Sequence, residues 1–204
     1  MPRILILGTR NLKKRRELEQ LLAGLKIELR TLADYPQAID VVEDGETFAE
    51  NAAKKAIQQA QHLGEWVLGE DSGICVDALD GRPGIYSARY SGADATDKSN
   101  NLLLLEELQS AASAERNAHY VCHVTLANER GEILIDLEEI CRGEILSTPR
   151  GTEGFGYDPL FEIPEYRKTF AELGAAVKSA LSHRGRAMRK LSAKLATLVK
   201  SETR

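Results

Sequence analysis

The stretch Trp66-Val67-Leu68-Gly69-Glu70-Asp71-Ser72-Gly73 places two adjacent carboxylates directly after an apolar segment. Its first four residues predict a buried β-strand, and the polar residues from Glu70 onward predict a turn at the carboxyl end of that strand. Ligands of open α/β sheets bind at this end of the strands. Neighbouring side chains of an extended chain point to opposite faces, so one carboxylate can reach a ligand while the other supports it. The stretch therefore predicts a carboxylate site, although a plain Asp-Ser-Gly turn fits the same residues.

Before this stretch, the pattern predicts one strand and two helices. Arg3 to Leu7 is a short apolar strand, and the leucines between positions 18 and 25 give one apolar face to a helix that follows it. A second helix is expected from about Thr47 to Leu63, because Thr47 and Glu50 form a capping box and Gly64 is a typical helix stop. The capping role gives Glu50 a structural task, so we do not expect it to bind a metal.

After this stretch, the pattern predicts a helix, a hairpin and a final helix. Four consecutive leucines, Leu102 to Leu105, predict a helix that is buried over a wide face. His119 to Ala127 and Ile133 to Arg142 alternate as the two strands of an antiparallel hairpin, which we expect to form a second lobe. Thr169 to Glu172 is another capping box. The final helix has an apolar face made of Met188, Leu191, Leu195, Leu198 and Val199.

Strands that alternate with helices, together with one hairpin, predict an α/β fold with a mixed sheet and helices on both sides. The 204 residues, of which 43% are hydrophobic, are enough for a well-buried core. We expect a single domain over residues 1–204, made of two closely packed lobes with a central cleft that binds the ligand.

Composition limits the partners of the chain. Its 27 Lys and Arg and 31 Asp and Glu residues give a net charge of −4, which does not favour binding to nucleic acid or to an anionic membrane. The apolar run from Ile4 to Leu7 is too short for a signal peptide or a membrane span, so we expect a cytoplasmic protein. Three cysteines without a C-x-x-C pair argue against a disulfide framework and a cysteine-based zinc site.

Two segments near the carboxyl end contain the groups that a purine nucleotide requires. Gly154 to Asp158 supplies an aromatic ring, Phe155, on which a base can stack. Lys178 to Arg184 adds three cationic or ionisable side chains that can bind the edge of a base or neutralise a phosphate. Each residue alone is better explained by an ordinary structural role, whereas the combination favours a nucleotide.

A basic cluster follows the first strand. Its members are Arg10, Lys13, Lys14, Arg15 and Arg16. These cations lie at the expected start of a helix, where the helix dipole is already positive, so an anion such as phosphate would offset an unfavourable charge. A solvated basic helix face is the alternative. The segment is not a P-loop, because that motif requires Gly before its Lys and Ser or Thr after it.

Acidic residues offer ligands for a divalent cation. The loop Glu43-Asp44-Gly45-Glu46 is either a solvated turn or a source of one carboxylate, Glu43. Mg²⁺ binds a few carboxylates, keeps several waters and bridges substrate phosphates. Glu43, Glu70 and Asp71 could supply this set around a triphosphate.

These motifs resemble the inosine triphosphate pyrophosphatase family. The resemblance rests on Thr9 to Lys14, Thr47 to Asn51, Glu70 to Gly73, Gly81 to Tyr90, Gly154 to Pro159 and Lys178 to Arg184, and it spans nearly the whole chain. It implies an elongated mixed α/β fold with two lobes around a nucleotide-binding cleft, and a homodimer. The implied activity is Mg²⁺-dependent hydrolysis of the non-canonical purine triphosphates ITP, dITP and XTP to the monophosphate and pyrophosphate, which cleanses the nucleotide pool.

The resemblance also assigns roles to individual residues. Glu43 and Asp71 would bind the metal, Asp71 would also take the proton of the attacking water, and Ser72 would contact the substrate. The phosphates would be bound by Thr9, Arg10, Asn11, Leu12, Lys13 and Lys14. The nucleobase would be bound by Phe155, Gly156, Tyr157, Asp158, Lys178, His183 and Arg184.

Two positions depart from the usual family pattern. Glu70 stands where many bacterial members have Asp, and Arg10 stands where Gly is frequent, so the reach of the second carboxylate and the conformation of the phosphate loop are open. Three other functions remain as alternatives. A related pyrophosphatase acting on pyrimidine or modified nucleotides would share these residues, and a nucleotide sensor would not require Glu43 and Asp71. A nucleic-acid-binding module is suggested only by a basic cluster near the last helix, without interleaved aromatic residues.

Overall fold

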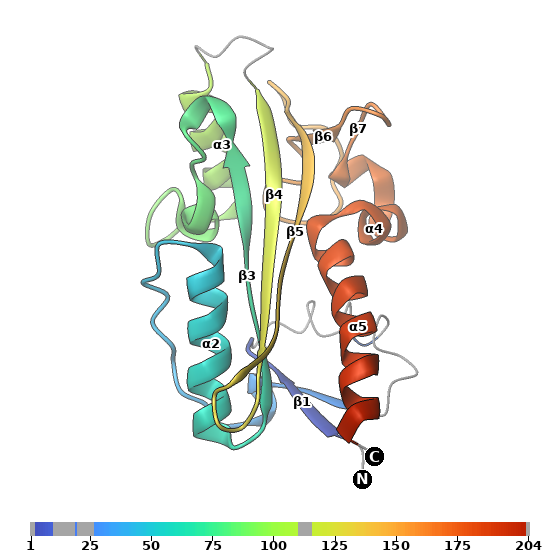
Figure 1. Cartoon of the computed structure of the whole chain (residues 1–204). Helices are drawn as coiled ribbons and strands as arrows, with labels where there is room; N and C mark the ends of the chain where they lie inside the picture. The colour runs from blue at the N-terminus through green and yellow to red at the C-terminus, as the bar shows by residue number, and fades with distance from the viewer. Residues whose placement is uncertain (1–2, 10–18, 20–26, 110–115, 203–204) are drawn as a thin grey trace. The chain divides into compact units, whose positions relative to one another are not determined.

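A computed structural model describes residues 3–9, 19, 27–109 and 116–202 of the chain (Figure 1). Its strands are β1 (Arg3–Leu7), β2 (Ile27–Thr31), β3 (Trp66–Val76), β4 (Asn117–Ala127), β5 (Ile133–Ile145), β6 (Phe161–Ile163) and β7 (Lys168–Thr169). Its α-helices are α2 (Phe48–Leu63), α3 (Asp97–Glu107), α4 (Phe170–Leu181) and α5 (His183–Glu202). Short 3-10 helices cover Leu32–Asp34, Asp77–Leu79 and Gly84–Arg89.

The described strands form one seven-stranded sheet in the order β2-β1-β3-β4-β5-β6-β7. β1 runs parallel to β2 and to β3, whereas β6 runs antiparallel to β5 and to β7. The sheet is therefore mixed, and the predicted α/β class is confirmed.

The chain divides into two compact units. One comprises Met1–Asp71, Cys122–Glu139 and Arg186–Arg204, and the other comprises Ser72–Val121 and Ile140–Gly185. We call them the first and the second unit. The β4–β5 hairpin, which the sequence predicted as a separate lobe, contributes residues to both units.

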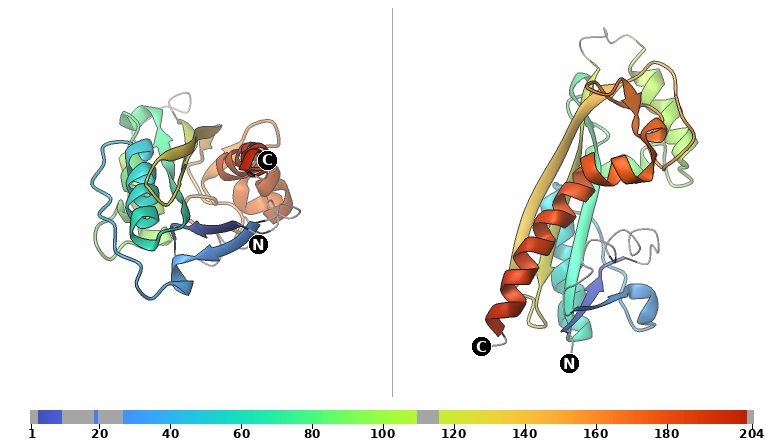
Figure 2. Two further views of the ribbon diagram at one scale, coloured as in Figure 1. Left: turned by 60° about the horizontal axis from the view of Figure 1, so that its bottom comes forward. Right: turned by 90° about the vertical axis from the view of Figure 1, so that its right-hand side faces the viewer.

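In the first unit, helices cover both faces of the sheet. Leu5 and Leu7 of β1 pack with Met188, Leu191 and Leu195 of α5. Ile6, which points to the other face of β1, packs with Ala56 and Ala60 of α2. Figures 1 and 2 show α2 and α5 flanking these strands. The predicted apolar face of the last helix is confirmed for its described members, because Met188, Leu191 and Leu195 are fully buried and Leu198 packs against the same core.

The core of the second unit is aromatic. Phe161 and Phe170 are almost fully buried, and their ring centroids lie 5.2 Å apart. Tyr120 of β4 packs edge-on against Phe161 at 4.7 Å. Such contacts between rings stabilise a core beyond the burial of their area. This cluster supports the segments that carry the predicted base-binding residues.

Several local predictions are confirmed. Helix α2 begins after Thr47, whose side chain accepts a hydrogen bond from the Glu50 N–H, and it ends at Gly64 with φ +68°. The Glu50 carboxylate bonds to the N–H of Glu46 instead of to the cap residue. The expected return bond from Glu50 to Thr47 is therefore wrong, whereas the capping box at Thr169 forms, because the Thr169 N–H donates to Glu172 at 2.9 Å.

Two predictions are wrong. β3 does not end at Gly69 but continues to Val76, because residues 70–73 stay extended within the sheet instead of turning. Asp71 therefore lies in the middle of a strand. Only Leu104 of the four consecutive leucines is buried, and Leu102 is 59% exposed, because a helix of this length directs such a run to several faces.

Candidate active site

The first group of site residues depends on the close approach of α2 to β3. A Cβ atom at Gly69 would lie 2.1 Å from the Ala52 carbonyl oxygen and 2.8 Å from the Ala56 nitrogen, so only glycine fits at this position. Asp71 lies two residues further along the strand and therefore points to the same face. The packing at Gly69 thus brings the first turns of α2 next to the carboxylate of Asp71.

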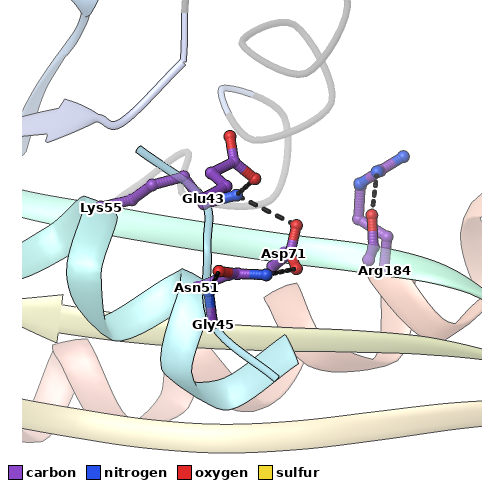
Figure 3. A network of polar contacts seen from close by, with 7 residues as sticks. Glu43, Gly45, Asn51, Lys55, Asp71 and Arg184 are labelled. Carbon is purple, nitrogen blue, oxygen red and sulfur yellow. Dashed lines mark hydrogen bonds and ion pairs between the residues drawn. The ribbon is translucent and has the colours of Figure 1, made fainter. Parts of the chain in front are cut away.

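Lys55 of α2 lies between two carboxylates (Figure 3). Its ammonium is 2.9 Å from Oε2 of Glu43 and 3.1 Å from Oδ1 of Asp71. The side chains of Lys55 and Asp71 are 11% and 14% exposed, whereas Glu43 is 39% exposed. One cation therefore compensates two anions in a place that is partly closed to water.

Asn51, one turn before Lys55, fixes the other oxygen of Asp71. Its Nδ2 donates to Oδ2 of Asp71 at 3.3 Å, and its Oδ1 accepts from the Gly45 N–H at 2.8 Å. A Cβ atom at Gly45 would lie 2.7 Å from that Oδ1, so the loop can approach α2 only with glycine here. Asn51 is 1% exposed. It ties the acidic loop that carries Glu43 to the strand that carries Asp71.

The environment of Asp71 alters its protonation. Burial raises the pKa of Asp71, the charge and hydrogen bond of Lys55 oppose this rise, and the negative charge of Glu43 adds to it. The net direction is upward. A carboxyl group with a raised pKa is a better proton acceptor than a free aspartate while it is still ionised at neutral pH.

Glu43 and Asp71 are the two carboxylates of this cluster that could hold a divalent cation. Mg²⁺ accepts oxygen ligands and commonly uses one or two carboxylates together with waters and phosphates. Among the described residues, no group of three or more His, Cys, Asp or Glu side chains could hold a metal ion.

The second group of site residues surrounds Asp158 in the second unit. Asp158 is 2% exposed, forms an ion pair with Lys178 and accepts a hydrogen bond from the Phe155 N–H at 2.8 Å. Burial raises the pKa of Asp158, and Lys178 opposes this effect. A Cβ atom at Gly154 would lie 2.0 Å from Oδ2 of Asp158, so glycine allows the chain to wrap around the carboxylate. Asp158 therefore holds the turn that carries Phe155.

Phe155 presents an exposed aromatic face next to two cations. The ring is 40% exposed, Nζ of Lys178 lies 4.3 Å from its centroid, and Cζ of Arg184 lies 5.7 Å from it. An exposed aromatic residue surrounded by cations is suited to stack on a planar, electron-rich ligand.

The last two predicted base-binding residues lie at the start of α5. Arg184, labelled in Figure 3, is 7% exposed, and its Nη2 donates to Oγ of Ser72 at 3.2 Å. His183 stacks on Tyr120 with ring centroids 4.6 Å apart and an interplanar angle of 6°. Both side chains are therefore held in fixed orientations by residues of the second unit.

The structure groups the predicted residues in two sets. Glu43 and Asp71 share Lys55 in the first unit. In the second unit, contacts join Phe155 with Asp158, Lys178 and Arg184, and Arg184 with Ser72. Thr9 of the predicted phosphate loop bonds through its N–H to the Leu7 carbonyl. Arg10, Asn11, Leu12, Lys13 and Lys14 lie outside the described residues.

Sequence reasoning missed Lys55 and Asn51. Both belong to the helix predicted from Thr47 to Leu63. Asn51 ends the Thr47 to Asn51 motif but was given no role, and Lys55 lies outside every motif. Their spacing of four residues, which places both side chains on one face of the helix, is the signal that would have indicated a polar stripe. Glu43 and Asp71 lie 12 to 20 residues from the side chains they contact, so this pairing required the fold.

The described helices include none with the length and hydrophobicity of a membrane span. A model of the Ham1 family matches residues 5–194. The chain is 52% identical to the dITP/XTP pyrophosphatase of Rhodopirellula baltica over 199 residues, which cover 98% of this chain and 96% of that protein. It is 50% identical to the dITP/XTP pyrophosphatase of Geobacter sulfurreducens over 184 residues, with 90% and 92% of the two chains covered.

Solved structures show the same fold. A HAM1 protein from Coxiella burnetii matches with a TM-score of 0.90 and 36% identity over 96% of this chain and 99% of that one. The nucleoside-triphosphatase or dITP/XTP pyrophosphatase of Mycobacterium abscessus matches with a TM-score of 0.77 and 38% identity, covering 92% and 97% of the two chains.

Proposed function

The chain belongs to the Ham1 family, and on this premise we propose that it hydrolyses the non-canonical purine triphosphates ITP, dITP and XTP to the monophosphate and pyrophosphate. Membership confirms the resemblance to the inosine triphosphate pyrophosphatase family that the motifs indicate. The similar proteins of Rhodopirellula baltica and Geobacter sulfurreducens bear the name dITP/XTP pyrophosphatase and match this chain over nearly its full length.

The observation that carries the proposal is the position of Lys55 between Glu43 and Asp71. Cleavage of a triphosphate requires a proton acceptor for water and positive charge for the phosphates. Asp71 supplies the acceptor, and its raised pKa suits that role. Lys55 supplies positive charge within reach of the same carboxylate.

Glu43 and Asp71 would hold Mg²⁺, which neutralises phosphate charge and acidifies a bound water. Asp71 takes the proton of the water that attacks the α-phosphorus, and Asn51 keeps its carboxylate in a fixed orientation. Pyrophosphate leaves from the other side of that phosphorus. The segment from Thr9 to Lys14 binds the phosphates in this proposal.

The second group binds the nucleobase. Phe155 stacks on the purine, and donors from Lys178, His183 and Arg184 read its 6-oxo group. An adenine base presents a 6-amino donor at this position, so the buried donors would lose their acceptor, and adenine is rejected for that reason. Guanine keeps the 6-oxo group and is rejected through its 2-amino group.

The family resemblance further supports a homodimer that acts in the cytoplasm and cleanses the nucleotide pool. Sedimentation analysis tests the homodimer, and fractionation of cells tests the cytoplasmic location.

The test of the function is a product assay with Mg²⁺ and five substrates, namely inosine, xanthosine, guanosine, adenosine and thymidine triphosphates, in which pyrophosphate is resolved from orthophosphate. We expect pyrophosphate, formed chiefly from the inosine and xanthosine substrates. Orthophosphate would identify a phosphatase, a preference for thymidine triphosphate would identify a pyrimidine-directed enzyme, and absence of turnover with binding would identify a nucleotide sensor.

A further inference from the structure

The backbone of Gly156, next to Phe155, is held on both sides by helix α3. The Gly156 N–H donates to Oδ2 of Asp97 at 2.8 Å. The Gly156 carbonyl accepts from Nδ2 of Asn101 at 3.0 Å. Gly156 has a φ of +61°, a conformation that favours glycine. Two side chains of α3 therefore satisfy both polar groups of one residue in the Phe155 turn.

Asp97 and Asn101 are placed for this task by the geometry of a helix. They are four residues apart, so they lie one above the other on the same face. The start of α3 is fixed by Thr96, whose side chain accepts from the Ser99 N–H at 3.1 Å. Asp97 also lies at the helix N-terminus, where a carboxylate is favourable. The Asp97 contact lies at the surface, whereas Asn101 is partly buried, and both side chains extend from the same capped helix start.

The position of Asn101 that allows its hydrogen bond to Gly156 has an energetic cost. Its Oδ1 is buried and accepts no hydrogen bond from the part of the chain that the structure describes, although an amide oxygen can accept two. A buried acceptor without a partner destabilises the fold. A leucine or alanine at this position would avoid that cost but would leave the Gly156 carbonyl without its donor. Asn101 is therefore better explained by its contact with Gly156 than by the packing of α3.

The same turn is held from its other side by Asp158, which accepts from the Phe155 N–H at 2.8 Å. Phe155 thus projects from a turn whose backbone is fixed both by Asp158 and by α3. Rotation of this turn would change the orientation of the ring and its distance from Lys178, which now lies 4.3 Å from the ring centroid.

We propose that Asp97 and Asn101 are positioning residues that hold the Phe155 ring in the orientation required to stack on the purine base. Neither residue contacts the substrate. The inference rests on the proposed function, because it assigns the Phe155 turn to base recognition. It predicts that the two residues affect binding of the base and leave phosphate cleavage unaltered.

The test compares Asp97→Ala and Asn101→Ala with the wild-type enzyme on dITP and on ribose 5-triphosphate, which has the phosphates but no base. For dITP we expect KM to rise about tenfold in each variant with kcat almost unchanged, as the loss of one or two hydrogen bonds allows. For ribose 5-triphosphate we expect no change. Asp97→Asn, which keeps an acceptor oxygen, restores most of the affinity, and Lys98→Ala, an exposed neighbour on α3, serves as the matched control.

A second readout follows the turn itself. Hydrogen exchange at the Gly156 amide should be slow in the wild type and at least tenfold faster in Asp97→Ala, because its acceptor is lost. Asn101→Asp, of the same size, places a carboxylate against the Gly156 carbonyl and should raise KM for dITP even if an alanine variant fails to fold. Unchanged exchange, an unchanged KM for dITP, or an equal loss on both substrates overturns the inference. Absence of turnover in the wild type would instead overturn the proposed function.

Discussion

The ammonium of Lys55 lies 3.1 Å from Oδ1 of Asp71, and their side chains are only 11% and 14% exposed. Attraction between two such groups is weakly screened by salt, and removal of Lys55 leaves Asp71 charged in a poorly solvated place, whereas Lys55 without Asp71 still has Glu43. Glu43, the second partner of Lys55, is 39% exposed and retains contact with water. The charge of Asp71 therefore depends on compensation by Lys55 more strongly than the charge of Glu43 does.

Asp71→Asn is expected to abolish most turnover while the fold and nucleotide binding persist. Asparagine has nearly the same shape but cannot accept the proton of water, so kcat should fall about 100- to 10,000-fold. Steady-state kinetics with dITP and a nucleotide-binding titration measure the two properties. A variant with a near-normal rate would remove Asp71 from the mechanism.

The same substitution should change the pH dependence of stability in metal-free buffer. Because the folded-state pKa of Asp71 is raised, the folded protein favours the protonated carboxyl, and stability is lost as pH rises through that pKa. Asp71→Asn should therefore gain stability over the wild type above the unfolded pKa of about 4, and the gain should vanish below about pH 3. Denaturation by urea at several pH values measures the difference in free energy of unfolding between Asp71→Asn and the wild type.

Asp44→Asn provides a control of opposite sign. The hydrogen bond from Lys54 lowers the pKa of Asp44, so ionised Asp44 stabilises the folded state above its unfolded pKa, and this contribution is lost as pH falls through the lowered value. The asparagine variant should be the less stable protein at neutral pH. If both variants moved in the same direction, the assignment of the raised pKa to Asp71 would be wrong.

Lys55→Met should destabilise the folded protein. Methionine keeps an unbranched side chain but leaves Asp71 buried without its cation, so we expect a loss of about 1–3 kcal/mol, less than for a fully buried pair because Glu43 is partly exposed. Urea denaturation at pH 7 with a chelator measures it. Lys54→Met breaks only an exposed ion pair with Asp44 and should cost clearly less stability than Lys55→Met. Equal losses in the two variants would contradict the assignment.

Arg184→Ala should weaken selection for 6-oxo purines. Arg184 lies beside the exposed ring of Phe155, and its loss removes a donor for the base. The ratio of kcat/KM for inosine to that for adenosine triphosphate should fall about tenfold. Arg186→Ala, an exposed arginine on the same helix, should leave the ratio unchanged. An unaltered ratio in Arg184→Ala would remove this residue from base recognition.

Local signals predicted α2, α3, α5 and the strands β1, β3, β4 and β5, but not β2, β6 and β7. The helix expected around residues 18–25 lies almost entirely outside the described residues. Thr47 and Gly64 defined both ends of α2, because the cap hydrogen bond and the positive φ depend only on neighbouring residues. β3 was predicted too short because Asp71-Ser72-Gly73 has the composition of a turn, whereas the neighbouring strands keep it extended. The intrinsic preference of a segment is overridden when the sheet supplies its hydrogen bonds.

Site residues that lie in short sequence motifs could be predicted, whereas residues that act through distant contacts could not. Phe155, Asp158, Lys178 and Arg184 were predicted because they lie in short motifs, and the structure brings them into contact. Lys55, Asn51, Asp97 and Asn101 were not, because each acts on a residue far away in the sequence. Contacts of that kind follow from packing and not from local composition.

Lys55 gives the two acidic side chains a built-in counterion. A newly synthesised chain can therefore close this part of the fold without first capturing a divalent ion, since like-charge repulsion between Glu43 and Asp71 is already offset. Proteins that build a site from bare carboxylates become dependent on metal supply for their maturation. Here, Lys55 compensates both carboxylates without a metal ion, so closing this part of the fold requires no bound cation.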